Sequence, residues 1–247
     1  MKYSSKGFTL LELSIVLIII GLIISGVTVG NELINQTRTK TIIIELKDIE
    51  TATNNFTTLY NYLPGDFPQA GKLWTSATCA NSAAPTGCNG NGDGQINIDV
   101  TLTLTGSEVY RVWQHLSLAG LLSGSYTGTN NKLDQYPSRY PNNLYTMRYT
   151  NAFSGASNFN VIEIGSWSAN TSGYLLASSG SLTPADANNL DKKLDDGYAN
   201  SGKLLGIDGD NVSNNSCSYP YSLAGGLKTY NINGNQGQFC KLQKILE

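Results

Sequence analysis

One carboxylate lies inside a long apolar segment near the N-terminus. From Phe8 to Val29 every residue is apolar or small, apart from four hydroxyl residues and Glu12. An unpaired carboxylate at the centre of a bilayer costs about 2.5–3.5 kcal/mol on insertion scales. A plain membrane anchor has no reason to carry that cost, so we expect a cation to pair with Glu12.

The same segment has the dimensions of a membrane span. It contains about 22 residues, or roughly 33 Å as a helix, which crosses a hydrocarbon core. Lys2 and Lys6 precede it, which predicts a cytoplasmic leader with the bulk of the chain outside. No A-x-A-like cleavage site follows the span, whereas the Gly7–Phe8 bond directly precedes it. Cleavage there would retain the helix and create an amino group at Phe8, one helical turn from Glu12, to pair with it within or between subunits.

These residues resemble a known signal. The run Lys6-Gly7-Phe8-Thr9-Leu10-Leu11-Glu12-Leu13, followed by many Ile, Leu and Val residues, is similar to the class III signal of type IV prepilins and type II secretion pseudopilins. The resemblance implies cleavage after Gly7 by a membrane prepilin peptidase, N-methylation of Phe8 and an assembly role for Glu12. It also implies other pilins or pseudopilins and an inner-membrane assembly platform as partners, with an assembly ATPase that supplies the force. An uncleaved signal anchor with a chance glutamate is the alternative.

The chain departs from the family's pattern in two respects. Val29 occupies the position at which many pilins have a helix-kinking proline, although Gly21, Gly26 and Gly30 would still loosen the helix. The chain is also longer than typical major pseudopilins, which indicates a minor subunit or an expanded globular region.

The Asn/Gly-rich segment 89–97 has the spacing of a calcium-binding loop. Oxygen side chains alternate along it, Gly94 stands at the sixth position and Ile96 at the eighth, as at the start of an EF-hand. The twelfth position holds Val100 instead of Glu, so a complete site needs Asp99 or a distant carboxylate such as Glu108. The resemblance to pseudopilins, several of which bind calcium in a C-terminal loop, supports such a site; the alternative, which we favour, is an Asn/Gly-rich turn without metal that the Cys79–Cys88 disulfide closes. The candidate ligands are Asn89, Asn91, Asp93, Gln95, Asn97 and Asp99.

All four cysteines lie downstream of the apolar segment. None belongs to a CxxC pair, which disfavours a zinc or redox motif. In an oxidising compartment we expect disulfides. Of the possible pairings we favour Cys79–Cys88 and Cys217–Cys240, because each closes a local loop that has little core to hold it; free buried thiols are the alternative.

The residue inventory does not favour an enzyme. His115 is the only histidine, and its helical surroundings indicate a packed or surface residue. No HExxH or GxSxG sequence occurs, and the P-loop-like run 197–203 lacks the following Ser/Thr. The acidic residues between 191 and 210 form either a second cation site or, as we favour, helix-end and turn interactions. A net charge of −2 predicts no nucleic-acid contact.

The elements around these residues predict an α+β pilin fold, in which one long helix packs on a small antiparallel sheet with long, disulfide-clipped loops. The helix runs from Phe8 to about Tyr60 and ends at the turn 64–66. Its second half is amphipathic. We predict a helix at 108–122 ending at Gly124, strands at 144–149, 159–164 and 173–178, and a helix at 183–194, with a loop at 69–100. The residues expected to face the sheet are Ile42, Leu46, Ile49, Thr53, Phe56 and Tyr60.

Together these features predict a leader at 1–7, a transmembrane or filament-core helix at 8–30, an amphipathic helix half at 31–62 and a periplasmic globular domain at 63–247. The expected function is a filament subunit of a type II secretion pseudopilus, first in the bacterial inner membrane and then in the periplasm. A cell-surface type IV pilus for adhesion, motility or DNA uptake is the alternative. A membrane-tethered ligand-binding module is the alternative of another class.

Overall fold

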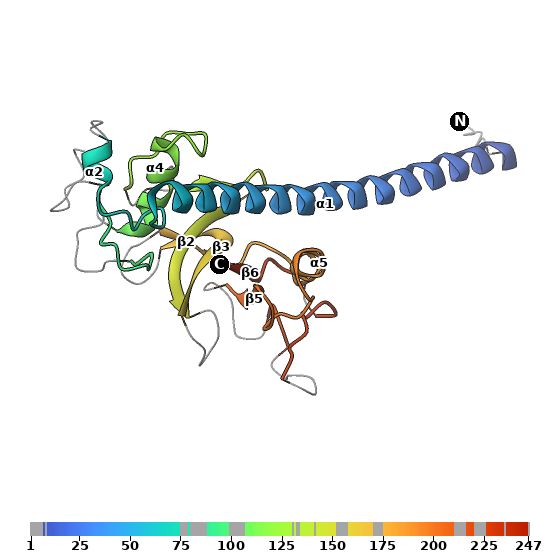
Figure 1. Ribbon diagram of the computed structural model, residues 1–247. Coiled ribbons are helices and arrows are strands. Elements are labelled where there is room, and N and C mark those ends of the chain that lie inside the picture. The colour runs from blue at the N-terminus through green and yellow to red at the C-terminus, as the bar shows by residue number, and fades with distance from the viewer. Residues whose placement is uncertain are drawn as a thin grey trace. The chain divides into compact units, whose positions relative to one another are not determined.

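The computed structural model describes residues 7, 9–74, 79, 88–98, 107–129, 131, 134–140, 142–151, 158–169, 175–209, 216–219, 226–234 and 236–246. The chain divides into two compact units, Met1–Lys40 and Thr41–Glu247. A single helix, α1 (Leu10–Tyr60), belongs to both units. Figure 1 shows this helix in blue, with the other elements grouped along its C-terminal part.

Helix α1 ends at a residue in the left-handed conformation. Asn61 has a φ of 59°, and its N–H bonds to the carbonyl of Thr57 at 2.8 Å. Asparagine tolerates this conformation better than most residues, so it stops a helix much as glycine does. The helix therefore ends before the turn at 64–66 that was expected to stop it.

The second unit is built on one face of α1. Ile42, Leu46, Ile49 and Phe56 have no exposed surface, and Thr53 is also buried. These side chains share a core with residues from the facing sheet, among them Met147, Ile162 and Leu242. Each fully buried aliphatic side chain contributes about 1.5–3 kcal/mol to stability. The predicted inward side of the helix is confirmed, except that Tyr60 is only half-buried.

An antiparallel sheet of six strands packs on this face. The strand order is β1 (Tyr136–Pro137), β2 (Leu144–Asn151), β3 (Asn158–Ala169), β6 (Cys240–Ile245) and β5 (Leu204–Asp208), and β4 (Leu175–Ser179) pairs with β3 outside this path. The longest ladder joins β2 to β3, from Leu144 opposite Gly165 to Asn151 opposite Asn158. The predicted α+β class, a long helix on an antiparallel sheet, is confirmed.

Three shorter helices complete the described part of this unit: α2 (Ala70–Leu73), α4 (Glu108–Leu118) and α5 (Pro184–Leu194). Gly120, with a φ of +70°, follows the end of α4, so this glycine stops the helix instead of Gly124. Thr183 caps α5 by accepting a bond from the N–H of Asp186 at 3.1 Å, as predicted from Thr-Pro at its start. Helix α2 lies in a segment expected to be loop.

Candidate functional site

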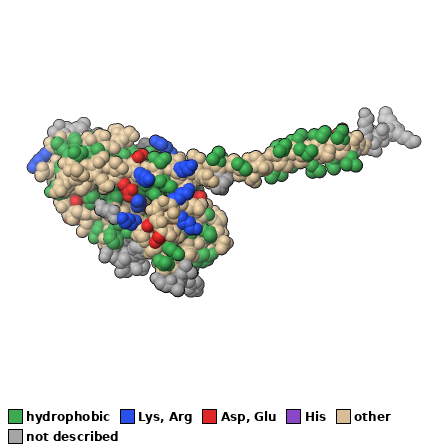
Figure 2. All heavy atoms as spheres, turned by 45° about the vertical axis from the view of Figure 1, so that its right-hand side comes forward, with side chains coloured by type: hydrophobic (Ala, Val, Ile, Leu, Met, Phe, Trp, Pro, Cys, Tyr) green, Lys and Arg blue, Asp and Glu red, His purple; other side chains and the backbone are tan. Residues whose placement is uncertain are grey.

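The N-terminal part of α1 exposes a largely apolar surface. Its side chains are exposed all around the helix, for example 88% for Leu10 and 69% for Leu22. Figure 2 shows hydrophobic side chains along the described length of this part. The helix is long and apolar enough to cross a membrane, and none of its most apolar 18-residue window is buried within the protein. This surface therefore needs lipid or partner helices to cover it.

Glu12 closes the first turn of this helix. Its Oε2 accepts bonds from the backbone N–H and the hydroxyl of Thr9, both at 2.8 Å, and its own N–H donates to the Thr9 hydroxyl at 3.3 Å. This reciprocal pair is a capping box, in which the residue before the helix and the third helical residue satisfy each other's amides. Sequence reasoning missed this role, although the Thr-x-x-Glu spacing signals it.

The predicted cleavage site directly precedes this capping box. Gly7 is exposed, so the structure places no described side chain over it. Phe8, the predicted methylation site, lies outside the described residues.

Three carboxylates converge in the second unit. Asp66, Asp93 and Glu108 each place one oxygen within 4.8 Å of the others, with Asp66 and Glu108 buried and Asp93 exposed. Asp66 follows α1, Asp93 lies in the segment 88–98 and Glu108 begins α4. The arrangement brings Asp93 and Glu108 together as the sequence suggested. Asp66 was missed, because it lies 27 residues before Asp93 and the sequence signal at 64–66 was interpreted only as a helix stop.

The backbone of segment 88–98 wraps around the two buried carboxylates. Asp66 accepts bonds from the N–H groups of Gly92 at 2.6 Å and Gly94 at 2.8 Å. Glu108 accepts bonds from the N–H groups of Asn91 and Asn97, both at 2.9 Å. These donors replace part of the water that the carboxylates lose on burial.

Burial governs the protonation of this cluster. It raises the pKa of Glu108 to about 7, the backbone N–H groups oppose this shift, and the nearby charges of Asp66 and Asp93 add to it. Burial also raises the pKa of Asp66, although three backbone N–H groups oppose the shift. Near neutral pH Glu108 is therefore close to its protonation midpoint, an environment in which a bound cation would be favourable.

The remaining predicted ligands make bonds inside the segment or to its neighbours. The side-chain oxygen of Asn89 accepts a bond from the N–H of Gly71 at 2.7 Å, and that of Asn91 accepts one from the N–H of Asp93 at 2.9 Å. The side-chain amides of Asn91 and Asn97 donate to Asp93. The N–H of Gln95 also donates to Asp93. Asp99 lies outside the described residues.

The segment is anchored on its N-terminal side by a disulfide and by α4. Cys79 is bonded to Cys88, and Cys217 is bonded to Cys240 elsewhere in the unit, so both pairings are those favoured from the sequence. The Arg111 side chain donates to the carbonyl of Asn89. The anchoring fixes where Asp93 can lie relative to Glu108.

His115 also holds this segment. Its Nδ1 accepts a bond from the N–H of Gly65 at 2.9 Å, and its Nε2 lies 2.8 Å from the carbonyl of Cys88, to which it donates. Burial lowers the pKa of His115 to about 4; the bond to Cys88 opposes this shift and the charge of Arg111 adds to it. The imidazole is thus a neutral, fully buried structural group, as the packed interpretation of the sequence proposed.

A second acidic group lies at the end of α5, where Asp191, Asp195 and Asp196 approach one another. Asp191 accepts bonds from the Tyr230 hydroxyl at 2.7 Å and from the N–H of Gly197 at 3.0 Å. Asp195 and Asp196 accept bonds from backbone N–H groups of the following turn and of β5. These contacts are the helix-end and turn interactions favoured from the sequence.

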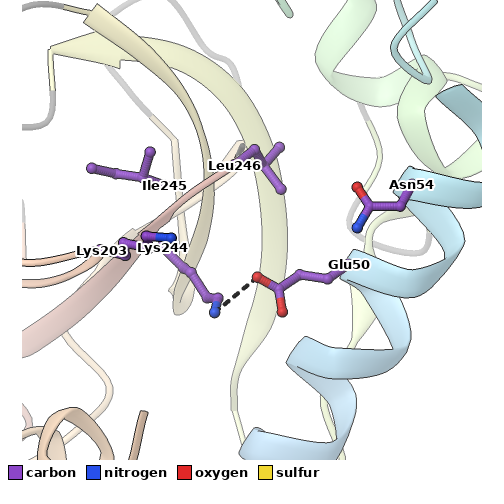
Figure 3. A pocket seen from close by; sticks show the side chains of 6 residues that line it. All are labelled: Glu50, Asn54, Lys203, Lys244, Ile245 and Leu246. Atoms are coloured by element: carbon purple, nitrogen blue, oxygen red, sulfur yellow. Dashed lines mark ion pairs between the residues drawn. The ribbon is translucent and has the colours of Figure 1, made fainter. Parts of the chain in front are cut away.

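A polar cavity of about 260 Å³ lies between α1 and the end of β6. Figure 3 shows the Lys244 ammonium facing the Glu50 carboxylate across it, at 2.8 Å, with Asn54 further along α1. Lys203 also lines this cavity, which is therefore charged and spanned by an ion pair. The residues that line it contain no nucleophile paired with a base.

Comparison with known proteins identifies the N-terminal segment. A search of curated proteins and a search of solved structures found no match. Residues 2–28 match the family model described as the prokaryotic N-terminal methylation motif, which spans Gly7, Phe8, Glu12 and most of the exposed apolar helix. The chain therefore carries, at residues 2–28, the class III signal of the type IV pilin and pseudopilin family.

Proposed function

We propose that this chain is a structural subunit of a type II secretion pseudopilus, cleaved after Gly7, methylated on Phe8 and polymerised through the N-terminal part of α1. The observation that carries the proposal is the methylation motif at residues 2–28, which includes the first part of an apolar helix that the protein itself leaves uncovered. Lipid covers the apolar surface of α1 before assembly, while the subunit is in the inner membrane. Partner helices cover it in the filament.

Glu12 makes this exchange selective. In the uncleaved chain the capping box satisfies its Oε2. After cleavage, the amino group at Phe8 of a neighbouring subunit supplies a full positive charge, which is a stronger partner than the Thr9 hydroxyl inside hydrocarbon. Docking an incoming subunit would thus pair two charges that are costly when alone.

The test replaces Glu12 with Ala in the full chain expressed in its own cells. We expect normal membrane insertion and a mature N-terminus at methylated Phe8, shown by intact mass, with loss of filaments from sheared fractions. The matched controls are Thr9→Val, which removes the capping hydroxyl but keeps Glu12, and Ser14→Ala on the next turn. Both should assemble at or near the wild-type level.

Three outcomes would contradict the proposal. Filaments from Glu12→Ala would favour a membrane-tethered binding module. Equal loss in Thr9→Val and Glu12→Ala would reduce Glu12 to a helix cap. A mature chain that still begins at Met1, or one cleaved beyond the span, would exclude processing by a prepilin peptidase.

The choice of a pseudopilus over a type IV pilus rests on Val29 and on the calcium-like segment. Helix α1 continues through Val29 without a break, which suits a chain that lacks the kinking proline. Deleting the gene tests the choice. Loss of a secreted exoprotein with surface pili intact supports the pseudopilus, and loss of pili, adhesion or DNA uptake with secretion intact supports the pilus.

We also propose that the carboxylate cluster binds calcium. The support is the approach of Asp66, Asp93 and Glu108 within 4.8 Å, with the pKa of Glu108 raised to about 7. Ca²⁺ prefers such oxygen ligands, and a cation there offsets the mutual repulsion of the carboxylates.

Calcium should raise the thermal unfolding temperature of the full chain in detergent, and EDTA should reverse the effect. Binding only the folded state stabilises it by about 2.7 kcal/mol at a hundredfold excess over Kd. Asp93→Asn and Glu108→Gln should each lower the affinity for calcium at least tenfold, and so reduce the calcium-dependent shift of the unfolding temperature. Asp196→Asn, in the second acidic group, should leave the shift of the unfolding temperature unchanged. An equal shift in all variants, or no shift in the wild type, would contradict a calcium site at this cluster.

A further inference from the structure

Three Asn–Gly pairs occur in the chain, at 89–90, 91–92 and 233–234. In such a pair the backbone nitrogen of the glycine can attack the side-chain carbonyl carbon of the asparagine, because glycine has no side chain to block the approach. The sequence presents all three pairs as equivalent. Their surroundings in the structure differ.

The first two pairs are locked by bonds to the attacking nitrogen. The N–H of Gly90 donates to the carbonyl of Phe67 at 2.9 Å, and the Asn89 side chain is held by Gly71. The N–H of Gly92 donates to Asp66 at 2.6 Å. Attack requires the nitrogen to lose its proton, and a neighbouring carboxylate disfavours the resulting negative charge.

The third pair is held less tightly. Asn233 and Gly234 are both exposed. The N–H of Gly234 makes one long bond, at 3.3 Å, to the carbonyl of Asn231, whereas the N–H groups of Gly90 and Gly92 make bonds of 2.9 Å and 2.6 Å. Gln236 closes the turn by donating to the carbonyls of Ile232 and Gly234, at 2.6 Å and 3.2 Å, so the turn is held through carbonyl groups.

We propose that Asn233 is a site of spontaneous deamidation, through a cyclic imide formed with the backbone nitrogen of Gly234, and that Asn89 and Asn91 are protected. A bond forms between that nitrogen and Cγ of Asn233. The side-chain nitrogen leaves as ammonia with the proton that the backbone nitrogen gives up. Water then opens the ring at either carbonyl and yields aspartate or isoaspartate, without any oxidant or cofactor.

The product changes the surface of the protein. A neutral amide becomes a carboxylate on an exposed turn, in a chain whose formal net charge is −2. The isoaspartate form also adds a methylene to the backbone of a turn that depends on the spacing between residues 231 and 236. Older molecules would therefore carry more negative charge at this turn, independently of how the chain assembles.

The experiment follows the native full chain in detergent at mildly alkaline pH, with peptide mapping over several days. We expect the peptide with Asn233 to gain the mass difference between a hydroxyl and an amino group at least ten times faster than the two other pairs. Gly234→Ala should slow this conversion about tenfold, because a side chain then hinders the attack.

The same chain in denaturant, with its disulfides intact, serves as the control. There all three pairs should convert at similar rates, which would show that the fold protects Asn89 and Asn91. Native conversion of Asn89 or Asn91 as fast as Asn233 would overturn the proposal. So would an Asn233 that stays intact in the native chain but converts in denaturant.

Discussion

Three glutamates of this chain show how surroundings set the role of one residue type. Glu12 is exposed on an apolar helix, and in the described structure its side chain bonds to Thr9, three residues before it. Glu45 is buried and accepts three bonds from the second unit. Glu108 is buried beside two other carboxylates, which leaves it poised near neutral pH. We therefore assign Glu12 to pairing with a partner subunit, Glu45 to a structural role and Glu108 to binding a cation.

His115 predicts a measurable dependence of stability on pH. Its pKa is about 4 in the folded state and near 6.5 when unfolded, so between these values the unfolded chain binds more protons. The contribution of the low His115 pKa to the free energy of unfolding is therefore fully present above about pH 6.5. It is lost as the pH falls towards 4, by up to about 3 kcal/mol at 1.4 kcal/mol per pKa unit.

The variant His115→Gln keeps a donor and an acceptor but cannot titrate. Its free energy of unfolding should fall below that of the wild type at pH 7, and the difference should shrink as the pH drops to 4. Denaturant unfolding across this range measures it. Glu108 and Asp191 have raised pKa values, so their contributions to the free energy of unfolding change with pH in the opposite direction. The comparison therefore uses the difference between the wild type and His115→Gln, in which these contributions cancel. A constant difference would contradict the low pKa.

At the scale of elements, Glu45 joins α1 to the β1–β2 edge of the sheet. Its carboxylate accepts bonds from the Ser138 hydroxyl at 2.6 Å, the Arg139 N–H at 2.7 Å and the Tyr145 hydroxyl at 2.8 Å. All three donors lose their partner if the carboxylate is removed. Of these donors only Tyr145 is fully buried, and a buried group left unpaired in this way costs about 1–3 kcal/mol, whereas Ser138 and Arg139 are partly or largely exposed to water.

Glu45→Ala should therefore destabilise the protein by about 1–3 kcal/mol, measured by denaturant unfolding. Glu50→Ala is the matched control on the same helix. Its ion pair with Lys244 is partly exposed, so its loss should cost less than about 1 kcal/mol. Equal losses in the two variants would show that the bonds of Glu45 do not set the position of the sheet.

Local patterns predicted most of these elements, and pairing between distant segments accounts for the rest. Helix α1 and helix α5 follow from apolar spacing and a cap, and β2, β3 and β4 follow from short alternating runs. Sequence reasoning assigned no strand to β5 or β6. Each is short, and β6 is stabilised by pairing with β3, some eighty residues away along the chain. Such pairing leaves little trace in a local window.

The carboxylate cluster illustrates the same limit at the site. Asp93 was found from the spacing of its loop, and Glu108 was named as a distant candidate. The position of Asp66 depends on the chain after α1, which leaves the helix at Asn61 and brings Asp66 against the segment 88–98. The role of Glu12, by contrast, was argued from a local cost, a charge inside an apolar run, and needed no tertiary information.

At the scale of the whole molecule, the chain combines two units with different needs. Unit Met1–Lys40 has its apolar side chains exposed, and unit Thr41–Glu247 contains the hydrophobic core, the sheet and both disulfides. Among the residues that the structure describes, the core of the second unit contains only residues from Ile42 onward. Its folding should therefore not require the apolar segment, because no described residue of that segment belongs to this hydrophobic core.

A chain that begins at Thr41 tests this division. We expect it to be soluble without detergent and monomeric in size-exclusion chromatography, with a thermal unfolding temperature within a few degrees of the full chain in detergent, a change that corresponds to about 1 kcal/mol. It should not enter filaments even when wild-type subunits are present, because assembly is assigned to the missing helix. An unfolded or aggregated product would show that the second unit depends on the first. Incorporation into filaments would move the assembly surface from α1 to the globular unit.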